Sequence, residues 1–147
     1  MSVCLFSSEA LAGLNDDEKA FLAEAGMKAQ EALMKCICPL GFLAAAVDEN
    51  EVTGTDINYR SVWARDGAIT AISSLFLTAR PFRKAARNTL RTLLDNISPN
   101  GQIPSNVRIE DGTPDYSGVG GIASIDSGLW VVIAYYQYVR VTGDTDI

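Results

Sequence analysis

The sequence predicts an all-α fold, and three observations lead to that prediction. Apolar residues recur at three-to-four spacing in several segments, which is the period of one helix face. Capping residues, prolines and glycines stand where such segments would begin and end. No segment alternates apolar and polar residues for long enough to make a central strand. The 147 residues suffice for a single domain, 1–147, with an apolar core.

The first predicted helix covers residues 16–37, with the sequence DDEKAFLAEAGMKAQEALMKCI. Its apolar residues fall on one face: Phe21, Leu22, Ala25, Ala29, Leu33 and Ile37. Asn15 can cap its start, because Glu18 follows three residues later in the capping-box relation. A polar, turn-rich segment comes next. Residues 15–37 are therefore expected to form one capped helix.

Two further helices are predicted at residues 67–79, with Asp66 as the cap, and from Pro81 to about Asn96. In the second of these, basic residues alternate with apolar ones, which is typical of a solvated face opposite a packed face. Almost no chain joins the two segments. We therefore expect them to be antiparallel neighbours.

A long stretch rich in Gly, Pro, Ser and Asp covers about 97–125 and is predicted to be an elaborate loop. Loops of this length inside a compact domain are usually functional. The fourth predicted helix runs from about Ser127 to Val141, and Gly143 is a natural stop. If it continues the up-and-down order, the second and fourth helices run parallel and start at the same end.

Both of those helix starts hold an acidic residue with a tryptophan nearby. One carries WARD at 63–66, and the other carries SID at 124–126 followed by Trp130. The long loop would lie over the surface they share, contributing Gln102, Asn106 and Tyr116. Aromatic faces suit the C–H side of a sugar, while carboxylates and amides suit its hydroxyls. The sequence therefore predicts a saccharide site at this end.

Composition excludes several other classes of function. The net charge of −6 argues against a nucleic-acid partner, which would need a basic surface. The N-terminus lacks the basic region of a signal peptide, and no stretch is apolar for long enough to span a bilayer, so we expect a cytoplasmic protein. The three cysteines have no zinc-site spacing. The absence of histidine rules out Ser–His–Asp and Cys–His mechanisms, which leaves carboxylate chemistry or none.

A resemblance to a known family rests on three segments in order: NYRSVWARDGAITAISSL, NGQIPSNV and YSGVGGIASIDSGLWVVIAYYQYVRVTGD. They resemble the glucosidase part of glycogen debranching enzymes (amylo-α-1,6-glucosidase) and are similar to the neutral/alkaline invertases. The resemblance covers about residues 55–146, and it makes the helix at 15–37 a lead-in helix to this region. It implies the N-terminal part of an (α/α)6 toroid of six helical hairpins. Such a ring needs more helices than the four predicted here, so the resemblance implies truncation at the C-terminus, with the missing C-terminal part as a candidate partner.

The resemblance also implies an inverting hydrolysis that uses a carboxylic acid and a carboxylate on opposite sides of the scissile bond. Asp126 matches the general acid of the family. Arg65 and Asp66 match the pair that holds sugar hydroxyls, and Trp63 and Trp130 would be apolar walls. The general base of the family lies on a later segment than this sequence reaches. No metal or organic cofactor is expected.

Each of these residues also has a purely structural interpretation. Asp66 and Asp126 can be helix caps, and the tryptophans can be core residues. Gln102 and Asn106, held as sugar ligands, can instead satisfy turn backbone. The positive end of a helix lowers the pKa of a carboxyl group, whereas a general acid needs a raised pKa. Desolvation by Trp130 and a bound sugar would have to outweigh the helix.

The leading functional hypothesis is a debranching glycoside hydrolase that acts on α-1,6-linked glucose in an α-glucan. An invertase-like sucrose hydrolase is the nearest enzymatic alternative. A second class is a helical fragment that binds oligosaccharide without cleaving it, or that completes another chain as a split subunit. A small helical bundle with a structural role is the third.

Overall fold

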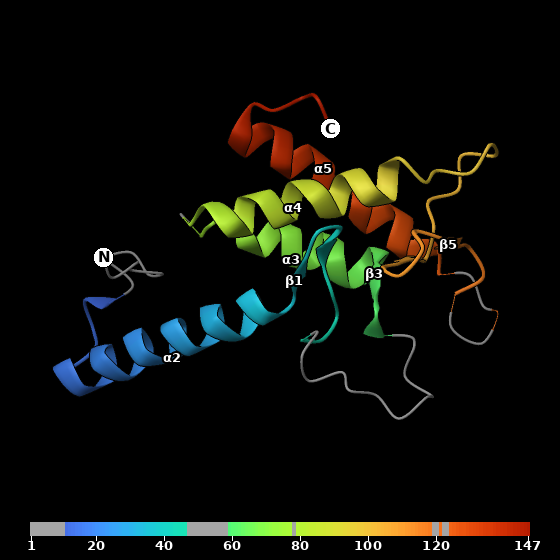
Figure 1. The fold of residues 1–147 in the computed structure, drawn as a ribbon. Coiled ribbons are helices and arrows are strands. Elements are labelled where there is room, and N and C mark those ends of the chain that lie inside the picture. The colour runs from blue at the N-terminus through green and yellow to red at the C-terminus, as the bar shows by residue number, and fades with distance from the viewer. Residues whose placement is uncertain (1–10, 47–58, 78, 119–120, 122–123) are drawn as a thin grey trace.

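The computed structural model describes residues 11–46, 59–77, 79–118, 121 and 124–147. These residues form four helices, which are α2 (Asp16–Lys35), α3 (Ala64–Ser74), α4 (Arg80–Leu94) and α5 (Ile125–Thr142) (Figure 1). They also form five short strands: β1 (Ile37–Cys38), β2 (Gly41–Phe42), β3 (Ser61–Trp63), β4 (Asn106–Arg108) and β5 (Pro114–Asp115). The strands pair in two antiparallel sheets, β1-β2 and β3-β4-β5.

The prediction of an all-α fold, and with it the N-terminal part of an (α/α)6 toroid, is therefore wrong: the described residues form a mixed α/β structure. Strands of two or three residues are too short to show alternation in a sequence. β4 and β5 lie inside the stretch 97–125 that was expected to be loop. β3 leads directly into α3, in a segment for which the sequence predicts no strand.

α2 begins as the sequence predicts. The Asn15 side chain accepts a hydrogen bond from the Glu18 amide (2.9 Å), and the Glu18 carboxylate accepts one from the Asn15 amide (2.8 Å). This reciprocal pair satisfies two backbone donors that the helix itself leaves open. The helix ends at Lys35, earlier than expected, because Ile37 and Cys38 pair with β2.

Two predicted helix caps are wrong. Trp63 and Ser124 occupy the cap positions of α3 and α5, so Asp66 and Asp126 lie inside the first turns. Both helices also start earlier than the 67–79 and 127–141 segments suggested. The stop at Gly143 is confirmed, since its φ of 72° is the left-handed conformation that glycine adopts without strain.

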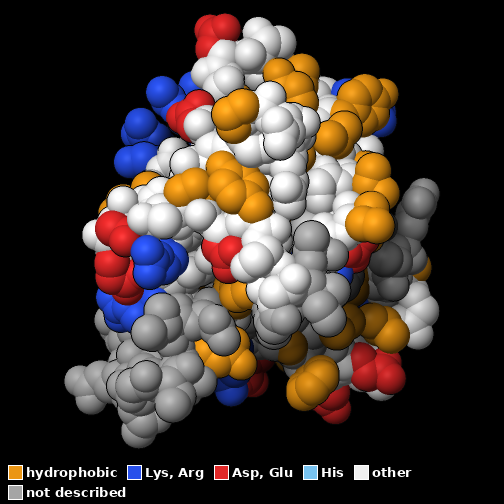
Figure 2. Space-filling view, turned by 90° about the vertical axis from the view of Figure 1, so that its right-hand side faces the viewer, with side chains coloured by type: hydrophobic (Ala, Val, Ile, Leu, Met, Phe, Trp, Pro, Cys, Tyr) orange, Lys and Arg blue, Asp and Glu red, His pale blue; other side chains and the backbone are white. Residues whose placement is uncertain are grey.

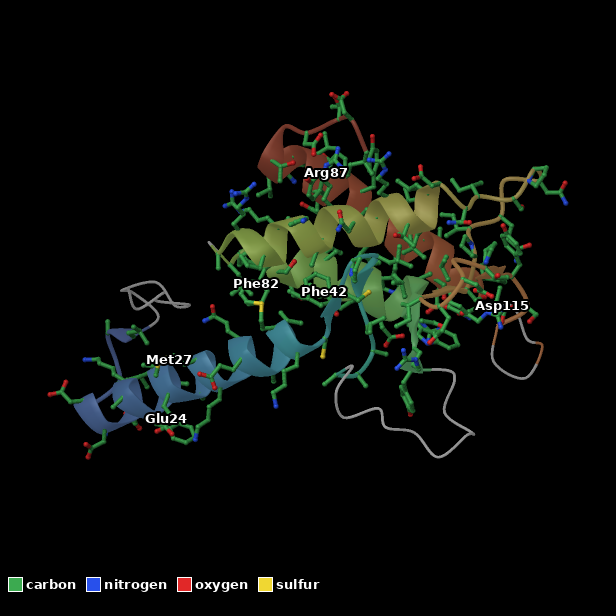
Figure 3. The ribbon with its side chains drawn as sticks, viewed as in Figure 1. Glu24, Met27, Phe42, Phe82, Arg87 and Asp115 are labelled. Atoms are coloured by element: carbon green, nitrogen blue, oxygen red, sulfur yellow. The ribbon has the colours of Figure 1, made fainter. Side chains whose placement is uncertain are left out.

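The core lies where α3 packs against both α4 and α5. α3 buries only small residues, among them Gly67, Ala68 and Ala71, which let the neighbouring helices approach closely. α4 supplies bulk with Phe82, Leu90 and Leu93, as its apolar spacing predicts, and Phe42 enters from β2 (Figure 3).

α2 extends away from the packed helices (Figure 1), and none of its residues is buried. Its most exposed large apolar side chain, Phe21, is 70% exposed. Leu33, near the end of the helix, does contact the core. The apolar face expected over 16–37 therefore exists in the sequence but is not buried in the structure.

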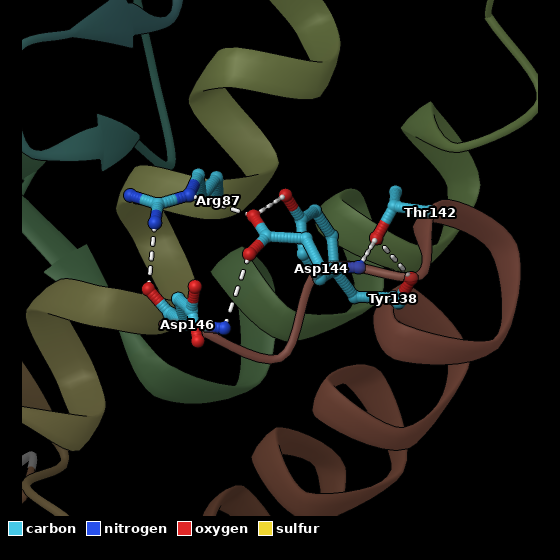
Figure 4. Close-up of polar contacts among 5 residues, drawn as sticks. All are labelled: Arg87, Tyr138, Thr142, Asp144 and Asp146. Carbon is cyan, nitrogen blue, oxygen red and sulfur yellow. Dashed lines mark hydrogen bonds and ion pairs between the residues drawn. The ribbon is translucent and has the colours of Figure 1, made fainter.

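After Gly143 the chain folds back onto α4 (Figure 4). The Asp144 carboxylate accepts hydrogen bonds from Arg87 Nε (2.8 Å) and from the Tyr138 hydroxyl (2.9 Å). Arg87 Nη2 also donates to the Asp146 carbonyl (2.6 Å). This polar cluster ties the last residues to α4, and Ile147 packs against the core.

Candidate functional site

The starts of α3 and α5 lie at the same end of the molecule, as the sequence predicts. α4 runs back beside α3, and α5 then runs in the direction of α3, so the two first turns are neighbours (Figure 1). The shared end holds Arg65 and Asp66 from α3 and Asp126 from α5. The backbone N–H groups at a helix start also favour negative charge there.

Arg65 bridges the two helices. Its Nη2 donates hydrogen bonds to Asp126 Oδ1 (2.6 Å) and to Ser124 Oγ (2.7 Å). The Ser124 hydroxyl also donates to the Asp126 carboxylate. Both charged side chains are 50% exposed, so the pair sits at the surface, where a ligand can reach it. Ser124 was not among the predicted site residues, since a lone serine before a helix has no distinctive sequence signal.

The pair sets the charge state of the carboxyl group. Hydrogen bonds from Arg65, the larger cause, and from Ser124 lower the pKa of Asp126 below its ordinary value. The same contact raises the pKa of Arg65. Asp126 is thus held ionised, which is the opposite of what a general acid needs before it donates a proton.

Asp66 is exposed in the first turn of α3. Its carboxylate makes no hydrogen bond or ion pair with another described residue, although it acts electrostatically on Arg65. It is therefore open to a ligand, and it stays a predicted hydroxyl-binding residue beside the Arg65–Asp126 pair.

The two tryptophans differ in their surroundings. Trp130 is half-buried and packs against the hydrophobic core, in line with its purely structural interpretation. Trp63 is half-buried at the end of β3, opposite Asn106 of β4. The structure brings Arg65 and Asp126 into contact but gives Trp130 a packing role.

A hollow of about 440 Å³, here called the α5 hollow, lies beside the first turns of α5. It is lined mainly by apolar groups, with Ser124 and Gln102 as its polar side chains; among the others are Ile103, Ile125, Gly128 and Leu129. Gln102, a predicted sugar ligand, is one of the residues that line it, and Gln102 Nε2 donates to the Tyr116 carbonyl (3.0 Å). The end of the molecule shown in Figure 2 carries separate hydrophobic patches among polar groups.

A second hollow of about 560 Å³, the sheet hollow, lies on the outer face of β3-β4-β5. It includes two residues from the predicted loop surface, Asn106 and Tyr116. The sequence did not indicate the other lining residues, which include Ser61, Arg108 and Asp115. These side chains come together only when the strands pair, so no local sequence pattern indicates them.

Other chemistry is sparse in the described part of the chain. Burial raises the pKa of the Cys38 thiol, which disfavours the reactive thiolate. Among the described residues, no group of three or more potential ligands is placed to hold a metal ion. In the same residues, no helix has both the length and the apolar character needed to span a bilayer.

Comparison of the chain with protein-family models, with curated proteins and with solved structures finds no match. The resemblance to debranching glucosidases therefore rests on the three sequence segments alone.

Proposed function

We propose that this chain carries the acid-bearing part of a glycoside hydrolase site of the amylo-α-1,6-glucosidase type, acting on branch points of glycogen or starch. The contact between Arg65 and Asp126 supports the proposal, because it joins two motifs that the resemblance assigns to one sugar-binding site. Their half-exposed position leaves both groups within reach of a saccharide.

In this proposal Asp126 protonates the oxygen that leaves with the remainder of the glucan. A bound sugar first draws Arg65 away from the carboxylate and excludes water, and both changes raise the pKa of Asp126. Arg65 and Asp66 then hold hydroxyls of the glucose unit. Inversion also requires a carboxylate base about 6.5–9.5 Å from the acid, which activates the attacking water.

A second candidate is a module that binds oligosaccharide without cleaving it. The lowered pKa of Asp126 favours this function, since an ionised carboxylate paired with arginine is well suited to accept hydroxyl hydrogen bonds but not to donate a proton.

A glucose-release assay separates these candidates. The purified chain, supplemented with the C-terminal part of a debranching glucosidase as the source of the carboxylate base, is incubated with a branched dextrin and, in parallel, with sucrose. Debranching predicts glucose from the dextrin that is lost in Asp126→Asn and kept in Asp95→Asn, an exposed carboxylate paired with Arg91 elsewhere on the surface. Release from sucrose alone would favour the invertase-like alternative. Dextrin binding without any released glucose would favour the non-catalytic module.

The proposed setting is the cytoplasm, where α-glucan stores are reached directly. The half-buried thiol of Cys38 suits such a reducing compartment. The proposed partner is an α-glucan, together with whichever polypeptide segment supplies the base; neither nucleic acid nor a membrane is part of the proposal.

A further inference from the structure

One face of the β3-β4-β5 sheet packs on the core, and the opposite face carries polar side chains together with Trp63. Val62 and Val107 point into the core and are 0% and 1% exposed. Side chains alternate along a strand, so the neighbours of these valines share the opposite face. The register places Ser61 opposite Arg108, and Asn106 opposite Asp115. The sheet hollow lies over this polar face.

Two polar side chains of the hollow are buried without full hydrogen bonding. Ser61 is 2% exposed and Asn106 is 5% exposed. The Ser61 hydroxyl has no hydrogen-bond partner among the described residues. The Asn106 side-chain Nδ2 donates to the Asp115 carboxylate only across a long 3.4 Å. The side-chain oxygen of Asn106, Oδ1, accepts a hydrogen bond from no described residue. Buried polar groups are costly when unpaired, so donors and acceptors in the hollow are available to a ligand.

The charges in the hollow cancel locally. Arg108 is paired with Asp111 (2.9 Å), while Asp115 accepts hydrogen bonds from the backbone and hydroxyl of Ser117 (2.8 and 2.7 Å). An anion would meet the Asp115 carboxylate, and a cation would meet the Arg108 guanidinium. The ligand that fits is therefore neutral and rich in hydroxyls.

The hollow also offers an apolar wall. Pro114 and Tyr116 line it, and the Tyr116 hydroxyl donates to the Asn96 carbonyl (2.8 Å), which fixes the side chain. Rings of this kind pack against the C–H face of a sugar. The hydrogen bond from Gln102 to the Tyr116 carbonyl joins this wall to the α5 hollow.

We propose that the sheet hollow is a binding site for one neutral sugar residue, held by Ser61, Asn106 and Asp115 against Tyr116. It is distinct from the Arg65–Asp126 pair and does not depend on hydrolysis.

The test titrates the full 147-residue chain with maltose, following backbone amides by NMR and affinity by calorimetry. Shifts are expected at Ser61, Asn106 and Ser117. Ser61→Ala and Asn106→Leu should each weaken maltose binding about tenfold, because a ligand hydroxyl then lacks its partner. Ser105→Ala is the matched control, a buried serine next to β4 that does not line the hollow, and it should bind maltose normally.

Circular dichroism shows whether each variant is folded. If the two buried-site variants unfold, Tyr116→Ala replaces them, because Tyr116 is only half-buried and forms the proposed apolar wall; it should weaken binding while keeping the fold. Unchanged affinity in the folded variants overturns the proposal, and so does displacement of maltose by inorganic phosphate, which would indicate an anion site. Asp126→Asn should abolish glucose release but not maltose-induced shifts at the sheet hollow, so failure of hydrolysis and failure of this site are distinguishable.

Discussion

Arg65 donates a hydrogen bond across 2.6 Å to Asp126, joining the first turn of α3 to the first turn of α5. The two residues are 61 positions apart in the chain. The contact shows that the two acidic helix starts meet at one end of the molecule. It also shows that the carboxyl group proposed as an acid rests as an ionised partner of arginine.

Arg65→Met should raise the pKa of Asp126 towards its ordinary value, because the largest cause of its lowering is removed. A carbon-detected NMR titration of the carboxyl group measures this directly. The pKa of Asp144, lowered by Arg87 elsewhere, should not change and is the internal control. An unchanged pKa at Asp126 would mean that the pair does not form in solution.

Gly41→Ala should destabilise the chain by about 3 kcal/mol or more, a cost typical of strong overpacking. Gly41 has a φ of 133°, and an added Cβ would lie 2.2 Å from Thr89 Oγ1 and 2.6 Å from Thr89 Cα. Urea unfolding gives the change in free energy. Gly101→Ala is the control: its φ of 81° is also positive, but no atom lies within 4 Å, so a strain cost of about 1–2 kcal/mol is expected. Equal losses in both variants would contradict close packing at Thr89.

Thr89→Val should cost about 1–3 kcal/mol, because it leaves a buried donor without its acceptor. The Phe42 amide donates to Thr89 Oγ1 (2.8 Å), and this hydroxyl donates to the Ala85 carbonyl (2.9 Å). Thermal and urea unfolding both report the loss. Thr70→Val, on half-buried α3 surface and without a hydrogen bond among the described residues, should be nearly neutral. A neutral Thr89→Val would show that β2 is not held to α4 in this way.

Asp144→Asn should loosen the segment after Gly143 and make stability less sensitive to acid. Arg87, then Tyr138, lowers the pKa of Asp144 in the folded chain. The stabilisation is therefore present above the unfolded-state pKa and is lost as pH falls through the lower, folded-state value. Hydrogen exchange at the Asp146 amide, which donates to Asp144 (3.1 Å), should quicken in the variant.

The control for the Asp144→Asn variant is Asp95→Asn. Arg91, which lies on α4 like Arg87, forms an ion pair with Asp95 at the end of that helix. Their side chains are 57% and 62% exposed, and such surface ion pairs contribute little to stability. If Asp95→Asn changed acid sensitivity as much as Asp144→Asn, the polar cluster around Arg87 would have no special role.

The helices were predictable from the sequence because their signals are local. The Asn15–Glu18 capping box, the apolar spacing of Leu90 and Leu93, and the stop at Gly143 each depend on residues within a few positions. Caps at Asp66 and Asp126 were predicted wrongly, because an acid in the first turn and an acid at the cap look alike in a sequence.

The sequence is enough to predict four helical segments, the parallel course of α3 and α5, and the acidic residues at the end where both begin. The fold was needed to show that short strands accompany the helices, that Trp130 packs against the core, that Arg65 lowers the pKa of Asp126, and that Ser61 and Asn106 line one hollow. The difference lies in how far apart along the chain the interacting residues are. A helix is specified by contacts within about one turn, whereas strand pairs and ion pairs join residues that meet only when distant parts of the chain have packed.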